Sequence, residues 1–234
     1  LTGFYMLIKN KLFKSSILFS ISVATKLVTL IILPLIIKKL EIKKNIKFYI
    51  VFLIFSVILW APFLNSKIYL NYFNTIMLWF NKFEFNASIY YIIREIGFYF
   101  KGYNIINEFS VISILIIILV IIFFSFFKKN NSIKEILSNQ LLLLTFYFFI
   151  STTVHPWYIT SLITICLLTP YFYPVIWSGL IFLSYSSYGS LGFQEKPIIL
   201  IIEYFVVFCL FIIETTGNKN RIFNAFAKTP SLSK

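Results

Sequence analysis

The chain has 234 residues, of which 59% are hydrophobic and only 12% are charged. A soluble domain carries about 25% charged residues, so this composition excludes a soluble globular protein, a disordered tail and a coiled coil, and it indicates an integral membrane protein. The 21 basic residues outnumber the 8 acidic ones, which gives a net charge of +13. Because the Lys clusters stand between apolar runs, we attribute this charge to membrane topology rather than to nucleic-acid binding.

The first apolar run covers residues 15–37 and contains Lys26. Basic clusters at 9–14 and 38–47 flank this run, and the preference of Lys and Arg for the cytoplasmic side places both clusters there. One run of this length cannot cross the membrane twice, since each crossing takes about 20 residues. We therefore predict a re-entrant or broken pair of half-helices that turns near Ala24–Lys26, with one ordinary span as the alternative.

Six further segments are apolar enough to cross the membrane, although several are short and need tilt or local thinning of the bilayer. They are Ile46–Leu64, Phe109–Phe127, Gln140–Val154, Tyr158–Phe172, Pro174–Tyr188 and Pro197–Ile213. With the Lys-rich loops inside, this topology predicts that the segment 65–108 lies outside and that the basic tail 214–234 lies in the cytoplasm.

The outer segment contains two predicted helices. Asn71–Phe83 repeats apolar residues at helical spacing, which is typical of an amphipathic helix lying on the membrane surface. The second helix begins after Asn86, a good N-cap residue, and covers Ala87–Phe98, with its end at Gly97 or Gly102.

These segments predict an all-α fold, a polytopic transmembrane helix bundle with a broken helix pair and an amphipathic helical segment on its outer face. We expect one transmembrane domain over residues 1–234. The abundance of Ile, Lys, Asn and Phe indicates an AT-rich genome, so we expect the inner (cell) membrane of a bacterium. Residues 1–8 look like the end of a helix that began upstream, so we expect the C-terminal part of a longer protein.

Two polar features in the first half of the chain are candidates for binding an anionic ligand at the outer face. Lys26 lies inside an apolar run, where an unpaired charge costs several kcal/mol, so it predicts a phosphate contact, with a Lys that reaches to the interface as the alternative. The second feature runs from Asn86 to Arg94. A helix N-terminus offers free N–H groups to an anion, Tyr90 or Tyr91 could stack on a sugar, and Arg94 could pair with a phosphate or with Glu95. The alternative is a surface helix packed on neighbouring spans.

His155, the only His in the chain, precedes Pro156, Trp157 and Tyr158. Pro156 cannot continue the preceding helix, so His155 lies at the outer membrane boundary, where Trp and Tyr are common. It could hydrogen-bond a phosphate or a sugar hydroxyl, or it could be incidental to an aromatic anchor. One His and two separated Cys do not form a recognisable metal site, so we predict no cofactor and no metal ligand, and a divalent metal stays open.

Three stretches of the chain resemble, in the same order, motifs of bacterial membrane glycosyltransferases of the GT-C fold, in particular polyprenol-phosphate mannosyltransferase-like proteins. They are Ala24-Thr25-Lys26-Leu27-Val28 running into Leu33-Pro34-Leu35, Phe85–Arg94, and His155-Pro156-Trp157-Tyr158.

The resemblance implies an enzyme that moves a hexose, often mannose, from a polyprenyl-phosphate donor to an acceptor on the extracytoplasmic face. Its partners would be this donor and membrane lipid, with no nucleic acid. By position, Lys26 would hold the donor phosphate and His155 would contact donor or acceptor. The substrate-binding residues that the resemblance implies are Lys26, Asn86, Tyr90, Arg94, His155 and Tyr158.

The catalytic base of this family is a carboxylate, usually Asp, in the first outer loop, and the chain contains no Asp. We therefore expect the base to lie upstream of Leu1 and assign no catalytic residue. Two other functions fit the same features. One is a transporter or flippase of an anionic lipid-linked substrate, which also uses an intramembrane Lys and a broken helix, and the other is a non-catalytic membrane subunit.

Overall fold

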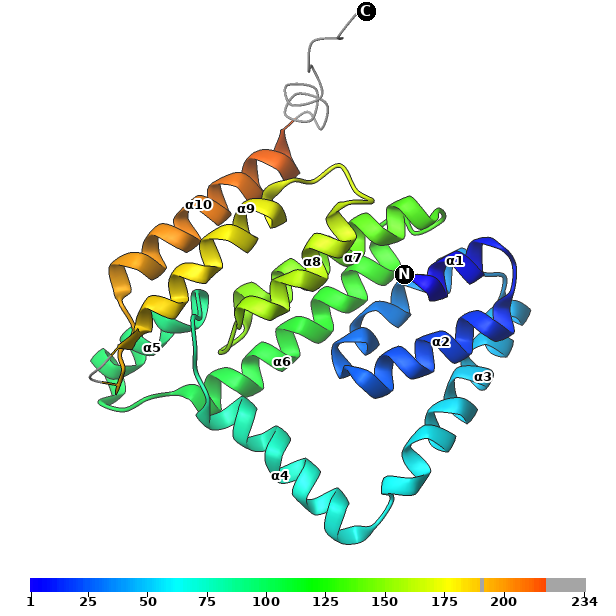
Figure 1. Cartoon of the computed structure of the whole chain (residues 1–234), viewed down its shortest axis with the longest axis horizontal. Helices are drawn as coiled ribbons and strands as arrows, with labels where there is room; N and C mark the ends of the chain where they lie inside the picture. Colours follow the sequence, from blue (N-terminus) through cyan, green and yellow to red (C-terminus); the bar gives the residue numbers. More distant parts are fainter. Residues whose placement is uncertain (190–191, 218–234) are drawn as a thin grey trace, which may run out of the picture. The chain divides into compact units, whose positions relative to one another are not determined.

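The computed structural model describes residues 1–189 and 192–217, and most of them are helical (Figure 1). In these ranges the only named strands are β1 (Tyr188–Gly189) and β2 (Gly192–Phe193), which pair antiparallel. The prediction of an all-α fold is therefore confirmed.

Four helical segments in the described ranges are long and apolar enough to cross a membrane. They are α3 (Ile42–Trp60) continued by η2 (Ala61–Phe63), α6 (Ile106–Ile122) continued by η3 (Phe123–Phe127), α7 (Ile133–Ile150) and α10 (Pro197–Thr216). They overlap the predicted spans that begin at Ile46, Phe109, Gln140 and Pro197. The chain is an integral membrane protein with a polytopic helix bundle.

One predicted span is not a continuous helix. The segment predicted at Tyr158–Phe172 consists of η4 (Pro156–Tyr158), α8 (Ile159–Cys166) and a non-helical stretch that contains Pro170. Pro has no N–H for the helical hydrogen bond and its ring crowds the preceding turn, so one long helix cannot form here. The prediction of a full span at this position is wrong.

Contacts within the chain divide it into two compact units, which are described separately. Unit 1 contains Leu1–Phe83 and Ile105–Leu144, and unit 2 contains Glu84–Asn104 and the described residues from Thr145 onward. The single domain over residues 1–234 stays a prediction. Of the predicted basic tail 214–234, residues 218–234 lie outside the described part of the chain.

In unit 1, α2 (Leu12–Thr25) packs against α1 (Thr2–Ile8) and against α3. The Ser15 hydroxyl donates a hydrogen bond to the Gly3 carbonyl at 2.8 Å, and the Ser20 hydroxyl donates to the Phe52 carbonyl at 2.9 Å. Both serine side chains are fully buried. Small residues let helix backbones approach closely in an apolar environment, so these serines explain why the three helices pack together.

The predicted break near Lys26 is confirmed. Helix α2 ends at Thr25, Lys26 has extended backbone angles, and η1 (Leu27–Lys39) begins directly after it. The two helices pack against each other, and the Ser22 and Thr29 hydroxyls are hydrogen-bonded across the break at 3.1 Å. Unit 1 therefore contains the broken helix pair that the sequence indicates.

Helix α4 (Ser66–Lys82) takes the place of the helix predicted at Asn71–Phe83, and it packs against α6 within unit 1. It begins earlier than predicted because the Asn65 side chain accepts the Lys67 N–H at 3.0 Å and so caps the first turn. Tyr69 and Phe73 are among its exposed apolar side chains, which suits a helix at a membrane surface. The outer location of 65–108 stays a prediction.

In unit 2, α9 (Tyr173–Leu180) packs against α8 and α10 and continues as η5 (Ile181–Ser187) (Figure 1). The predicted span Pro174–Tyr188 is thus helical but shorter than the four long segments. Glu214 explains how α9 begins, because its Oε2 accepts the N–H groups of Phe172 at 2.8 Å and Tyr173 at 3.1 Å. A carboxylate at the N-terminal end of a helix accepts hydrogen bonds from N–H groups that have no partner within the helix. Its negative charge also interacts favourably with the helix dipole.

Candidate functional site

Two sequence-predicted stretches meet in unit 2 through their backbones. The Phe85 N–H donates to the Thr152 carbonyl at 3.0 Å, and the Val154 N–H donates to the Phe85 carbonyl at 2.9 Å. The Ser88 hydroxyl adds a hydrogen bond to the Phe149 carbonyl at 2.8 Å. These bonds place the residues that follow Phe85 directly beside the segment that leads into His155.

An aromatic stack reinforces this junction. The His155 ring lies between Phe85, at a centroid distance of 4.9 Å, and Trp157, at 4.3 Å, and both pairs are stacked. Tyr158 meets the edge of His155 at 5.4 Å and stacks on Phe148 at 6.0 Å. Burial lowers the pKa of His155, so its neutral form is favoured at pH 7.

Asn86 stands at the centre of the junction, in a left-handed backbone conformation with φ of 46°. Asn adopts this region more readily than most residues because its short side chain bonds locally. Its backbone N–H donates to Glu195 Oε1 at 2.8 Å, its carbonyl accepts from the Tyr204 hydroxyl at 2.6 Å, and its Nδ2 donates to Glu203 Oε1 at 3.1 Å.

The prediction that Asn86 caps the following helix is therefore wrong. Helix α5 (Ile89–Lys101) begins three residues later, after Ser88, and Asn86 uses its side chain to bind α10 instead. The predicted end at Gly102 is confirmed, since Gly102 is in the left-handed conformation that ends many helices.

Glu203 is the buried acid of this network. Its side chain is 1% exposed, and its Oε1 accepts hydrogen bonds from Asn86 Nδ2 and from Trp177 Nε1 at 3.0 Å. Its Oε2 has no hydrogen-bond partner among the described residues. An acid inside a membrane-spanning segment is costly unless its partners compensate, so Glu203, Asn86 and Trp177 form one energetic unit.

A second polar cluster surrounds Arg94 on α5. Its Nη1 donates to Glu84 Oε1 at 2.8 Å, and its Nη2 donates to Glu95 Oε1 at 3.0 Å. The Tyr90 hydroxyl donates to Glu84 Oε2 at 2.5 Å and lies 2.8 Å from Asn104 Oδ1. Burial, and then the bond to Glu84, raises the pKa of Tyr90, so this hydroxyl keeps its proton. Arg94 is therefore already paired with two carboxylates.

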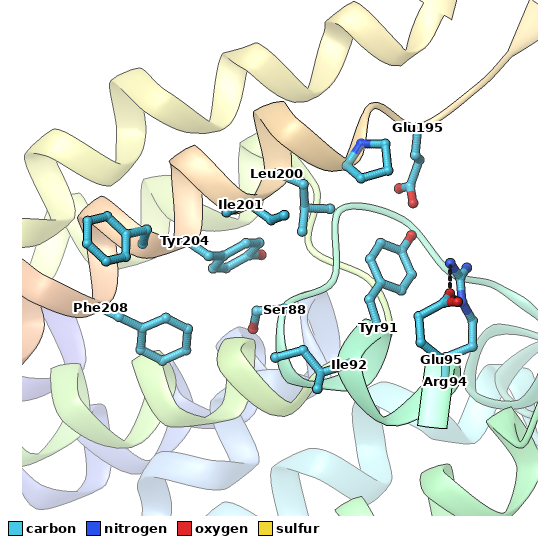
Figure 2. A pocket seen from close by; sticks show the side chains of 12 residues that line it. Ser88, Tyr91, Ile92, Arg94, Glu95, Glu195, Leu200, Ile201, Tyr204 and Phe208 are labelled. Atoms are coloured by element: carbon cyan, nitrogen blue, oxygen red, sulfur yellow. Dashed lines mark hydrogen bonds and ion pairs between the residues drawn. The ribbon is translucent and has the colours of Figure 1, made fainter. Parts of the chain in front are cut away.

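A cavity of about 660 Å³ lies between α5 and α10, which is a size typical of ligand sites (Figure 2). We call it the α5–α10 cavity. One end is polar and contains Tyr91, Arg94, Glu95 and Glu195, while the remaining wall is largely apolar. The residues that line it are Ser88, Tyr91, Ile92, Arg94, Glu95, Glu195, Pro197, Leu200, Ile201, Tyr204, Phe205 and Phe208.

Tyr91 closes the polar end of the cavity. It is 8% exposed, its hydroxyl has no hydrogen bond of ordinary geometry within the described residues, and Figure 2 shows this hydroxyl pointing toward Glu195. Burial, followed by Glu195 and Glu84, raises the pKa of Tyr91, so the hydroxyl stays protonated at neutral pH. The Arg94 guanidinium covers the Tyr91 ring, with Cζ 4.4 Å from the ring centroid.

Five of the six predicted substrate-binding residues lie in unit 2, and one of those five lines the cavity. Arg94 is that residue, while Asn86, Tyr90 and His155 are buried and hold the surrounding segments. Tyr158 lies in the aromatic cluster around His155. Lys26 belongs to unit 1.

Glu195 and Tyr204 were not predicted as site residues, and Tyr91 was predicted only as the alternative to Tyr90 for stacking on a sugar. Glu203 had a usable signal, because an acid within an apolar run indicates a buried partner or a function. Glu195 follows a polar stretch and gives no such signal in the sequence. Its role depends on the fold, which brings it to the Asn86 N–H from 109 positions away.

Within the described ranges, no group of three or more His, Cys or acidic side chains is placed to hold a metal ion. Comparison with protein-family models, with curated proteins and with solved structures finds no match to this chain.

Proposed function

We propose that the protein is a membrane glycosyltransferase that moves a hexose, such as mannose, from a polyprenyl-phosphate donor to an acceptor on the extracytoplasmic face. One observation supports it most. Phe85–Arg94 and His155–Tyr158, which resemble two motifs of such enzymes, lie together in unit 2 although about sixty positions separate them in the sequence.

The reaction explains why such a site needs both apolar and polar parts. A hydroxyl oxygen of the acceptor forms a bond to C1 of the hexose, the bond from C1 to the phosphate oxygen breaks, and polyprenyl phosphate leaves. The hydroxyl proton passes to a base. The acceptor enters from the membrane, so a cavity beside the apolar helix α10, with charged groups at one end, suits an acceptor that has an apolar chain and a polar head group.

The buried motif residues then act as positioning residues. Asn86 fixes the turn before α5, and the Phe85–His155–Trp157 stack fixes the segment before α8. Glu84 is bonded to Tyr90 and Arg94, so we assign it no catalytic role. Lys26, at the break between α2 and η1, is the residue we propose for the donor phosphate, because a Lys ammonium binds phosphate as a point charge.

The test measures transfer of radiolabelled mannose from polyprenyl-phosphate mannose in liposomes that hold the protein as its gene encodes it. Lys26→Ala should lower transfer by at least about tenfold, since loss of one charged group at a reacting phosphate costs this much or more. Lys14→Ala, which removes an exposed Lys from the helix that ends just before Lys26, is the matched control and should leave transfer unchanged.

Two results would contradict the proposal. One is the absence of labelled product with every membrane or protein acceptor supplied. The other is the appearance of intact labelled donor on the opposite face of the bilayer without transfer, which would indicate a flippase instead.

A further inference from the structure

The polar end of the α5–α10 cavity carries more negative than positive charge. Glu95, Glu195 and Arg94 line this end. Glu84 does not line the cavity, but it accepts a hydrogen bond from Arg94 Nη1. The formal charge of these four side chains is therefore −2. Lys196 is exposed and lines a small neighbouring pocket that shares Glu195 and Leu200 with the cavity, but it does not line the cavity itself.

Arg94 is poorly placed to attract an anion into this cavity. Its Nη1, Nη2 and Nε are all bonded to carboxylates, and its face covers Tyr91. A phosphate at this end would lie close to the carboxylates of Glu84, Glu95 and Glu195, and the negative charges would repel each other. The charge pattern favours a cationic group instead.

Tyr91 and Glu195 provide acceptors for such a cation. The Tyr91 hydroxyl is buried and points toward Glu195 without a hydrogen bond of ordinary geometry, although a buried polar group without such a bond costs free energy. Glu195 is held in place because its Oε1 accepts the Asn86 N–H. An ammonium group has three N–H donors, so it can bond to the Tyr91 oxygen and to the Glu195 carboxylate together.

The rest of the cavity is suited to an apolar chain. Leu200, Ile201 and Phe208 from α10 and Ile92 from α5 lie along it (Figure 2), and Phe205 of α10 also lines the cavity. Ile92, Ile201 and Phe205 are more than 60% exposed, so the cavity reaches the surface of unit 2 beside a membrane-spanning segment. A ligand that enters here from lipid has an alkyl chain along α10 and its head group at Tyr91.

We propose that the α5–α10 cavity binds an amphiphile that joins an apolar chain to a primary ammonium group, and that this amphiphile is the acceptor of the sugar. Its role as acceptor rests on the proposed function, while its binding rests on the charges and contacts of the cavity. The ammonium group is recognised and does not react. A hydroxyl oxygen of the same molecule forms the bond to C1 of the hexose.

Three probes with one chain length test the binding: octylammonium, octyl phosphate and octanol. Equilibrium dialysis of radiolabelled probes against the detergent-solubilised protein measures each affinity. Partition into detergent is the same for all variants, so differences between variants report on the cavity. We expect octylammonium to bind about tenfold more tightly than octyl phosphate, which is the scale of one hydrogen bond to a charged group.

Glu195→Gln should remove most of this preference while keeping an oxygen for the Asn86 N–H. Tyr91→Phe should weaken octylammonium binding about threefold, as expected for one modest hydrogen bond, and leave octanol binding unchanged. Glu41→Gln removes an exposed acid of unit 1 and should change nothing. Tighter binding of octyl phosphate, or an unchanged preference in Glu195→Gln, would overturn the proposal.

The mannose transfer assay separates the two proposals. If the protein transfers mannose but binds octyl phosphate more tightly than octylammonium, the proposal of an ammonium-bearing acceptor is refuted, while the proposed glycosyltransferase function is supported. Selective binding of octylammonium without any transfer would support the cavity and refute the glycosyltransferase function and the acceptor role.

Discussion

The two units of this protein use charge in opposite ways. Unit 1 contains 14 basic and 3 acidic residues, a formal charge of +11, whereas the described part of unit 2 contains 3 basic and 5 acidic residues, a formal charge of −2. In unit 1 the Lys residues fall in short clusters between apolar runs, as membrane topology requires. In unit 2, acids such as Glu195 and Glu203 have a specific partner that is distant in the sequence, Asn86.

The buried polar groups differ in the same way. The buried serines of α2 bond to backbone carbonyl oxygens, which have other partners in their helices, so little depends on any one of them. Glu203 and Glu214 bond to donors that would otherwise be unpaired in an apolar environment. The buried polar groups of α2 are therefore individually less important than the buried acids of unit 2.

The largest stability effect should come from Glu203→Ala. This change leaves the buried donors of Asn86 and Trp177 without partners, and each such donor costs about 1–3 kcal/mol, so we expect a loss of about 3 kcal/mol. Thermal unfolding in a non-ionic detergent measures it. Glu203→Gln keeps the accepting oxygen and should lose clearly less, and equal losses for Ala and Gln would show that the hydrogen bonds do not matter.

Glu214→Ala should have the next largest effect. The first N–H groups of α9 lose their acceptor, and loss of such a cap costs about 1 kcal/mol. The control is Glu41→Ala in unit 1, whose exposed ion pair with Lys44 should contribute less than about 0.5 kcal/mol. Equal losses of stability in the two variants would contradict the claim that acids contribute more to stability in unit 2 than in unit 1.

A smaller effect should appear as a dependence on pH. Burial lowers the pKa of His155 in the folded protein, so its contribution is fully present above the unfolded pKa of about 6.5 and is lost as pH falls through the lowered folded pKa. His155→Phe keeps an aromatic ring in the stack and should remove this dependence. Unfolding temperatures measured from pH 7.5 to pH 4.5 would refute the prediction if the two proteins changed in parallel.

The smallest effect should come from Ser20→Ala in unit 1. The lost hydrogen bond to the Phe52 carbonyl should cost about 0.6 kcal/mol, the average for side-chain hydrogen bonds between membrane helices. The same unfolding measurement checks it. If Ser20→Ala loses as much stability as Glu203→Ala, the buried hydrogen bonds of α2 are as important for stability as those of unit 2, which would contradict the comparison.

The sequence predicts the parts of the fold that depend on composition alone. The long apolar runs around α3, α6 and α10 indicate membrane spans, and the basic clusters on both sides of residues 15–37 indicate the break near Lys26. Local rules failed where tertiary contacts decide the outcome. Asn86 has the side chain of a helix cap but binds Glu203, which is 117 positions away.

For the candidate site too, the sequence predicted some residues, while others depend on tertiary contacts. The motifs at Phe85–Arg94 and His155–Tyr158 were found from the sequence, and the fold brings both into unit 2. Their short backbone hydrogen bonds and the burial of His155 could not be derived from residue types. The cavity itself depends on α10, whose apolar face looks like any lipid-facing surface in the sequence, so Phe205 and Phe208 carried no signal of a binding site.

The most direct test of a lipid-binding site in unit 2 is photolabelling with an alkylamine that carries a diazirine in its chain, followed by mass spectrometry of the labelled peptides. The account predicts label on α5 and α10 at Ile92, Ile201, Phe205 or Phe208, with competition by octylammonium and loss of this label in Glu195→Gln. Label spread evenly over the exposed apolar surface of α3 and α10, without competition, would contradict it.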